Sequence, residues 1–108
     1  LQKSGVTKSN NQSVVLIVDE KKYGIPRNII VKALNAEGVI ARRYFLPSLH
    51  KLKQFSDGKN IILPNTEKFQ SKNIVMPIGA KTTCESIYRI CNLLKVFRIN
   101  ALSIKNHE

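Results

Sequence analysis

The sequence contains no tryptophan, one methionine and two cysteines among its 108 residues, and its histidines and cysteines have no metal-ligand spacing. Two cysteines do not make a disulfide scaffold. Cys84 and Cys91 would lie about 10.5 Å apart along a helix, too far for a disulfide bond. We therefore predict no metal site, and we expect both cysteines to be small apolar residues on the packed face of that helix.

Long apolar runs are also missing. The longest, Val14–Val18, has the length of a strand, whereas a membrane span needs roughly 18–20 apolar residues. The first residues lack the apolar segment of a secretory signal, and they lack an initiator methionine, which suggests a mature product or a piece of a longer chain. The glycines stand alone, so there is no phosphate-binding loop, and no serine lies in a nucleophile elbow. These absences predict a cytoplasmic protein without a membrane segment.

Basic residues are what the sequence has in excess. It contains 18 Lys+Arg against 7 Asp+Glu, which gives a net charge of +11 and a pI near 10.0. This balance makes nucleic acid or an anionic membrane surface a possible partner. The cations are scattered along the chain, however, and only residues 42–45 (RRYF) place basic and aromatic residues together. A small basic nucleic-acid-binding domain is therefore the less favoured alternative.

The length suits one domain, and 43% hydrophobic residues is an ordinary globular value. Residues 1–12 are polar and are predicted to be a linker or a disordered end, residues 13–98 the folded domain, and residues 99–108 a tail. The order of strands and helices predicts a two-layer α/β sandwich with a small sheet. The predicted elements are a strand at 13–18 covered on both faces, a charged turn at 19–24, a helix at 26–37, a strand at 39–45, a loop at 51–63, a helix at 64–72, a strand at 73–78 and a helix ending near Arg98.

The last helix has the clearest start signal. Thr82 and Glu85 fit a capping box, in which the threonine accepts from the amide of the glutamate. Apolar residues then recur at spacings of three and four, which predicts one packed face. That predicted face comprises Ile87, Ile90, Cys91, Leu94 and Phe97.

Tyr44 and His50 flank Pro47 at the exit of the predicted second strand, a place where functional loops often lie. An imidazole at this position could contact an anionic ligand or transfer a proton. The alternative is a loop histidine that caps the short turn it starts, and the residues alone favour this alternative.

Several segments resemble, in order, a stretch of the DegT/DnrJ/StrS family of pyridoxal-phosphate (PLP) aminotransferases. The resemblance covers about residues 14–97. Its parts are a helix start at 24–34, a turn and loop at 37–50 (EGVIARRYFLPSLH), and the segments 63–67 (LPNTE), 75–77 (VMP) and 82–85 (TTCE).

This resemblance implies the C-terminal small domain of a fold-type I aminotransferase, an α+β fold with a small, mostly antiparallel sheet of about three to four strands packed against helices. The parent enzyme would act on nucleotide-activated keto sugars in bacterial amino-sugar biosynthesis. Its partners would be a large PLP-binding domain, a second subunit in a homodimer, and the nucleotide-sugar substrate. The family's Schiff-base lysine has no counterpart here, so the chain alone is expected to bind no PLP and to be inactive. A PLP-dependent sugar dehydratase of the same family is an open alternative.

The resemblance also places four residues near the substrate. Arg42, Arg43, Tyr44 and His50 match the loop that faces the sugar nucleotide, and none is assigned as catalytic. Cations and a phenol there would contact the diphosphate and the sugar hydroxyls. The sequence departs from the family at Asn28, where aspartate is usual, and in the loop before His50, which is one residue longer. A domain of this kind should also expose an apolar patch where its large domain packs.

Overall fold

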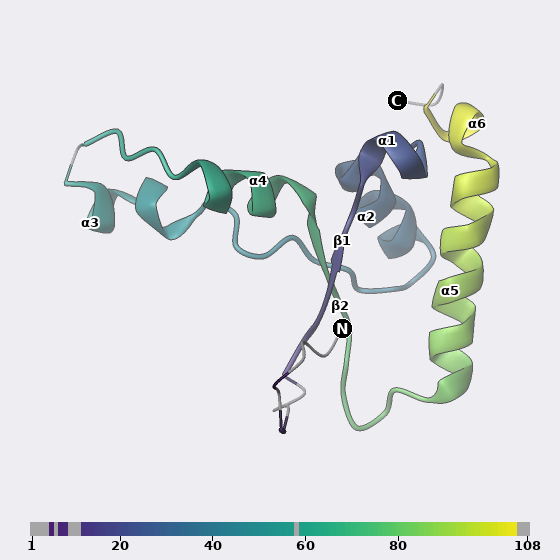
Figure 1. Cartoon of the computed structure of the whole chain (residues 1–108). Helices are drawn as coiled ribbons and strands as arrows, with labels where there is room; N and C mark the ends of the chain where they lie inside the picture. The colour runs from purple at the N-terminus through teal and green to yellow at the C-terminus, as the bar shows by residue number, and fades with distance from the viewer. Residues whose placement is uncertain (1–4, 6, 9–11, 58, 106–108) are drawn as a thin grey trace.

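The computed structural model describes residues 5, 7, 8, 12–57 and 59–105. A small sheet lies at the centre, with α1, α2 and α5 to one side, while α4 and an arm formed by residues 45–57 and 59–63 extend to the other (Figure 1). The elements are β1 (Val14–Ile17), α1 (Glu20–Tyr23), α2 (Arg27–Ala36), the 3-10 turn η1 (Leu49–Lys51), α3 (Lys53–Ser56), α4 (Pro64–Lys72), β2 (Asn73–Met76), α5 (Cys84–Ile99) and α6 (Ala101–Lys105).

The sheet has one packed face and one open face. β1 and β2 are antiparallel, with Leu16 opposite Ile74 and Val15 opposite Val75. Because side chains alternate along a strand, Leu16 and Ile74 point towards the helices, and Ile74 is fully buried. Val15 and Ile17 are 40% and 55% exposed. The prediction of a strand covered on both faces is wrong, since the described helices cover only one face.

The predicted strand at 39–45 is also wrong. Only Arg42 pairs with β2, through reciprocal backbone hydrogen bonds with Val75 of 3.0 and 2.8 Å. The amide of Val39 instead donates to the carbonyl of Leu34, and the amide of Ala41 donates to the carbonyl of Val39. These local hydrogen bonds use the amides of Val39 and Ala41, so those amides do not pair with β2. The sheet therefore has two strands and one bridge among the described residues, fewer than expected, within the mixed α/β fold that was expected.

Helix α2 forms where the sequence predicts it. Pro26 precedes its first turn, and Gly38 has the left-handed φ of 77° that ends the helix and lets Val39 fold back. The helix packs between the sheet and α5 (Figure 1). The core that it builds consists of Val18, Ile25, Ile29, Ile30, Val31, Leu34, Val39, Ala41, Ile74, Met76 and Phe97.

The segment predicted as a charged turn forms the single helical turn α1. The Asp19 side chain accepts from the amide of Lys22, and Gly24 ends the turn with a left-handed φ of 94°. The Tyr23 hydroxyl donates to the carbonyl of Leu94 at 2.6 Å, which ties α1 to α5. Ala101 and Ile104 of α6 pack on the same core, so part of the segment 99–108 is helical.

Helix α4 and strand β2 lie at the predicted positions. Pro64 occupies the first turn of α4, and β2 ends before Pro77, which cannot donate to a ladder. The segment predicted as a loop at 51–63 contains α3, and η1 overlaps its start.

The start of α5 corrects the predicted capping box. Thr83, not Thr82, is the N-cap, and its hydroxyl accepts from the amide of Ser86 at 3.2 Å. Threonine hydroxyls at this position stabilise helices by satisfying a free amide. The helix thus begins one residue later than the Thr82–Glu85 spacing indicates, because Ser86 takes the third helical position.

Replacing each threonine in turn by alanine distinguishes the predicted N-cap, Thr82, from the observed N-cap, Thr83. We expect Thr83→Ala to lower the free energy of unfolding by about 1 kcal/mol, because the amide of Ser86 loses its partner. Thr82→Ala is the matched control and should have a much smaller effect. Thermal unfolding followed by circular dichroism measures both, and an equal or larger loss for Thr82→Ala would restore the predicted box.

The two cysteines are not on the packed face. Both are free and exposed, whereas Ile90, Leu94 and Phe97 pack on the core. Ile87 is also half exposed. The packed stripe of α5 is therefore narrower than predicted, since α2 covers only one side of the helix.

Candidate functional site

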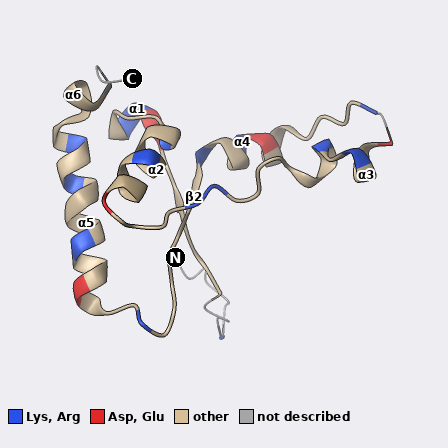
Figure 2. Cartoon of the chain, turned by 180° about the vertical axis from the view of Figure 1, so that it is seen from behind, with Lys and Arg blue, Asp and Glu red and all other residues tan. Residues whose placement is uncertain are grey.

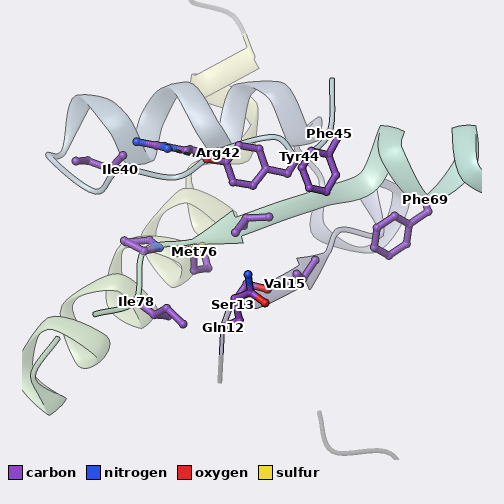
Figure 3. A pocket seen from close by; sticks show the side chains of 12 residues that line it. Gln12, Ser13, Val15, Ile40, Arg42, Tyr44, Phe45, Phe69, Met76 and Ile78 are labelled. Carbon is purple, nitrogen blue, oxygen red and sulfur yellow. Dashed lines mark hydrogen bonds between the residues drawn. The ribbon is translucent and has the colours of Figure 1, made fainter. Parts of the chain in front are cut away.

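The open face of the sheet forms the floor of a groove of about 680 Å³, hereafter the sheet groove (Figure 3). Its apolar lining includes Val15 and Val75 of the sheet, Ile78 beyond β2, Phe45 of the arm and Phe69 of α4. These segments bring exposed apolar side chains together on one side, as the sequence led us to expect.

Arg42 and Tyr44 place polar groups in this apolar groove. The Nη1 atom of Arg42 donates to the Tyr44 hydroxyl at 2.7 Å, and the guanidinium lies 6.0 Å from the centre of the tyrosine ring. Tyr44 stacks on Phe45, with ring centres 5.4 Å apart. The backbone pairing of Arg42 with Val75 fixes the start of this group to the sheet.

The electrostatics of the pair follow from its contact. The hydrogen bond to Tyr44 raises the pKa of Arg42 further above its ordinary value, at which a guanidinium is already charged. A guanidinium has five N–H donors, and the bond to Tyr44 uses one of them. The remaining donors suit a phosphate or carboxylate, and the phenol oxygen suits a hydroxyl group. The pair can therefore bind an anionic, hydroxylated ligand against an apolar wall.

Arg43 is not part of this pair. It does not line the sheet groove, and its Nη1 atom donates to the side-chain oxygen of Asn28, in the first turn of α2, at 3.3 Å. Asn28 is the residue that stands where the family usually has an aspartate. Arg43 thus connects the loop to α2.

His50 lies in a neighbouring hollow of about 350 Å³, which shares Tyr44, Phe45 and Phe69 with the sheet groove. Its side chain is only 8% exposed, and Nε2 lies 3.3 Å from a carboxylate oxygen of Glu67 on α4. The structure therefore separates His50 from Arg42 while leaving both beside Tyr44.

Two residues of α4 that the sequence did not single out hold the arm in place. Gln70 donates from Nε2 to the carbonyl of Phe45 and accepts from the hydroxyl of Ser48, both at 2.5 Å. Glu67, one turn earlier, accepts from His50 and lies 3.2 Å from the Lys51 ammonium. We call Glu67 and Gln70 the clamp. The sequence feature that they share is a spacing of three on one helix, which places both side chains on the same face.

The clamp should respond to acid. Hydrogen bonds from His50 and then Lys51 hold the pKa of Glu67 below its ordinary value. A carboxyl with a lowered pKa in the folded state stabilises the fold above its ordinary pKa and loses that contribution as the pH falls through the lowered value. We expect the amide signals of His50 and Lys51 to shift over this acidic range in an NMR titration.

Glu67→Gln should remove this transition, because the amide does not titrate. Glu85→Gln, at an exposed glutamate of α5, is the control and should leave it intact. If the Glu67 carboxyl titrated with its ordinary pKa in the folded chain, the contacts of Glu67 with His50 and Lys51 would be contradicted.

The sheet groove does not supply the groups that hold PLP. The cofactor needs a lysine for its Schiff base and a carboxylate at its ring nitrogen. None of the twelve residues that line the groove is a lysine, an aspartate or a glutamate. In the part of the chain that the structure describes, no cluster of three or more histidine, cysteine or acidic residues could hold a metal ion. Within the same residues, no helix combines the length and apolarity needed to cross a bilayer.

Comparisons with known proteins point to one family. The chain is similar to the protein in the crystal structure of DesI in the presence of its TDP-sugar product, with 29% sequence identity and a TM-score of 0.79. This match covers 93% of the chain and 26% of the DesI chain, so the chain spans about a quarter of that relative. A comparison with curated proteins gave no match. The model of the DegT/DnrJ/EryC1/StrS aminotransferase family matches residues 2–95. The chain therefore belongs to the DegT/DnrJ/EryC1/StrS aminotransferase family.

Proposed function

We propose that this chain is the C-terminal small domain of a cytoplasmic, PLP-dependent aminotransferase that converts nucleotide-activated keto sugars into amino sugars. The joined Arg42 and Tyr44 side chains on an open apolar groove carry this proposal. Support comes from the family and from the similarity to DesI, whose structure was determined with a TDP-sugar product.

Each predicted site residue has a distinct proposed role. Arg42 binds the diphosphate through its guanidinium donors, and Tyr44 offers its hydroxyl to the sugar or a phosphate oxygen. Arg43 orients the loop through Asn28. His50 acts through Glu67 and positions the arm beside Tyr44. None of these residues performs the transfer of the amino group.

The apolar walls of the sheet groove suit a second partner, the large PLP-binding domain of the same enzyme. Phe45, Phe69 and Ile78 expose 71%, 53% and 40% of their surface, which is unfavourable in water and favourable against an apolar face. PLP would be held by the large domain and supply the amino-transfer chemistry there. The chain alone is then inactive, and the complete enzyme is a homodimer.

The distribution of charge favours a sugar nucleotide over a nucleic acid. Lys and Arg residues lie on α1, α2, α4 and α5 and on the arm that contains α3 (Figure 2). A nucleic-acid site requires cations gathered along one surface that follows the phosphate backbone. In the described part of the chain, the basic residues are therefore distributed over several elements rather than gathered on one.

The experiment is isolation of the native protein from its source cells with an antibody raised against the 108-residue chain. We expect a mass several times 12.2 kDa, bound PLP, and amino transfer to a nucleotide-linked keto sugar. A native mass near 12.2 kDa together with salt-sensitive DNA binding would overturn the proposal. Bound PLP with loss of water from the sugar, and no amino transfer, would identify the dehydratase instead.

Substitution of Arg42 in that enzyme tests the site itself. Because a hydrogen bond to a charged group contributes about 1.5–3 kcal/mol, Arg42→Ala should raise KM for the nucleotide sugar by about 10- to 100-fold. The effect on the amino donor should be small. Lys68→Ala, at an exposed cation of α4 outside the groove, is the control. Equal effects of the two substitutions would remove Arg42 from the substrate site.

A further inference from the structure

The outer edge of β1 carries backbone groups that β2 does not use. The amide of Val18 donates to the carbonyl of Lys72 at 2.9 Å, and in an antiparallel pair such bonded positions recur at every second residue. Val75, opposite Val15, exchanges both of its backbone hydrogen bonds with Arg42 on the far side of β2. Val15 and Ile17 therefore direct their N–H and C=O groups away from β2, towards an edge where no other described strand lies.

Nothing within β1 protects this edge. Residues 14–17 contain no proline and no charged side chain, and their register with β2 has no bulge. Proteins commonly use such features to prevent an edge strand from pairing with another chain. The exposed Val15 and Ile17 side chains add apolar surface beside the free backbone groups. Such an edge is a template for an added strand.

A groove of about 570 Å³ runs beside this edge, between β1 and α5. Leu94 of α5 forms part of its apolar wall. Lys22, Arg98 and Asp19 line the same groove, and Asp19 lies 3.9 Å from Lys22. One carboxylate against two cations leaves the groove with a positive charge.

We propose that the outer edge of β1 binds an extended acidic segment of a protein partner, which joins the sheet as an added strand. Its backbone pairs with Val15 and Ile17, its alternate apolar side chains enter the groove, and a carboxylate binds Arg98 and Lys22. A second copy of the chain fits less well. Each copy carries a net charge of +11, and β1 has no carboxylate to place opposite these cations. This binding surface adjoins the substrate groove at Val15, which lines both, whereas Arg98 and Lys22 line only the groove beside β1.

The test uses the isotopically labelled 108-residue chain and a capped synthetic peptide of three threonine–valine repeats followed by two glutamates. Hydrogen exchange of the Val15 and Ile17 amides, followed by NMR, should slow on peptide addition, because both amides become hydrogen-bonded. A control peptide that ends in two lysines should bind about tenfold more weakly, which corresponds to about 1.4 kcal/mol. Equal affinity for the two peptides, or no change in exchange at either amide, would overturn the proposal.

Val15→Pro removes the outward N–H without removing a bond between β1 and β2, and proline is tolerated on an edge strand in this position. The variant should keep its circular dichroism spectrum and lose peptide binding, whereas Val15→Thr should keep both. Arg98→Glu should reverse the preference between the two peptides. Peptide binding by Val15→Pro at wild-type affinity would overturn the proposal. So would a dimer that forms without peptide and that Val15→Pro dissociates, because a second copy would then occupy the edge.

Discussion

Replacement of Leu34 by alanine is expected to lower the free energy of unfolding by about 2–5 kcal/mol. Leu34 has no exposed surface and lies in the core between α2 and the sheet. Its carbonyl also accepts from the amide of Val39 in the turn that ends α2, so a collapse of the cavity would disturb that turn. A domain of this size has a small net stability, and the loss would bring it close to unfolding at 25 °C.

Urea unfolding followed by circular dichroism measures this loss. Lys32→Ala is the control, because Lys32 lies on the same helix with its side chain exposed. We expect the control to change the free energy of unfolding by less than about 0.5 kcal/mol. Similar unfolding midpoints for the two variants would show that the core is not centred on Leu34.

The second large effect is expected at Arg27, a buried cation at the start of α2. Its Nη1 atom donates to the carbonyls of Gln70 and Asn73, at 3.1 and 2.8 Å, where α4 passes into β2. Burial, with a smaller contribution from Arg43, lowers the pKa of Arg27. Arg27→Met keeps the volume and removes the donors, which leaves these carbonyls unpaired. Because each unsatisfied buried group costs about 1–3 kcal/mol, we expect a loss of about 2–4 kcal/mol.

The chain offers a matched control for this substitution. Arg89 also donates to a backbone carbonyl, that of Glu37, at 3.1 Å, but it does so on the surface. Arg89→Met should change stability by less than about 0.5 kcal/mol, because water replaces the lost bond. Arg27→Lys should lie between the two, since an ammonium has no planar pair of donors. A loss for Arg27→Met no larger than that for Arg89→Met would contradict the role assigned to the buried guanidinium.

Local signals in the sequence predicted the elements that local forces determine. Pro26 and Gly38 set the ends of α2, and Pro64 and Pro77 set the start of α4 and the end of β2. The helix predicted at 26–37 agrees with the observed α2, Arg27–Ala36. These features depend on residues close together in the chain, which a single sequence shows directly.

The errors arose where distant contacts decide the outcome. The run at 39–45 has the composition of a strand, yet the turn after Gly38 uses its first amide, and only Arg42 reaches β2. The exposure of Cys84 and Cys91 depends on how much of α5 the helix α2 covers, which the spacing of α5 does not contain. The error at the start of α5 is instead local: adjacent Thr82 and Thr83 can both act as an N-cap, and in the structure Thr83 accepts from the amide of Ser86.

The sequence named four residues for the candidate site but did not predict how they are arranged. The structure joins Arg42 and Tyr44, two of the predicted site residues, by a hydrogen bond, and their role towards a substrate stays a prediction. The separation of Arg43 and His50 depends on Asn28 and Glu67, which come from other helices. The sequence shows neither helix beside the loop, so the clamp formed by Glu67 and Gln70 required the structure.

The junction between α4 and β2 connects the arm to Arg42. The chain passes from Lys72 of α4 to Asn73 of β2 without an intervening residue. The Arg27 guanidinium donates to a carbonyl on each side of this junction, those of Gln70 and Asn73. Helix and strand are therefore joined directly, with the hydrogen bonds of Arg27 on both sides of the junction. The arm is hydrogen-bonded to Gln70, in the last turn of α4 close to this junction, and Arg42 is hydrogen-bonded to Val75 of β2. A continuous set of hydrogen bonds thus links the arm, through α4 and β2, to the backbone of Arg42.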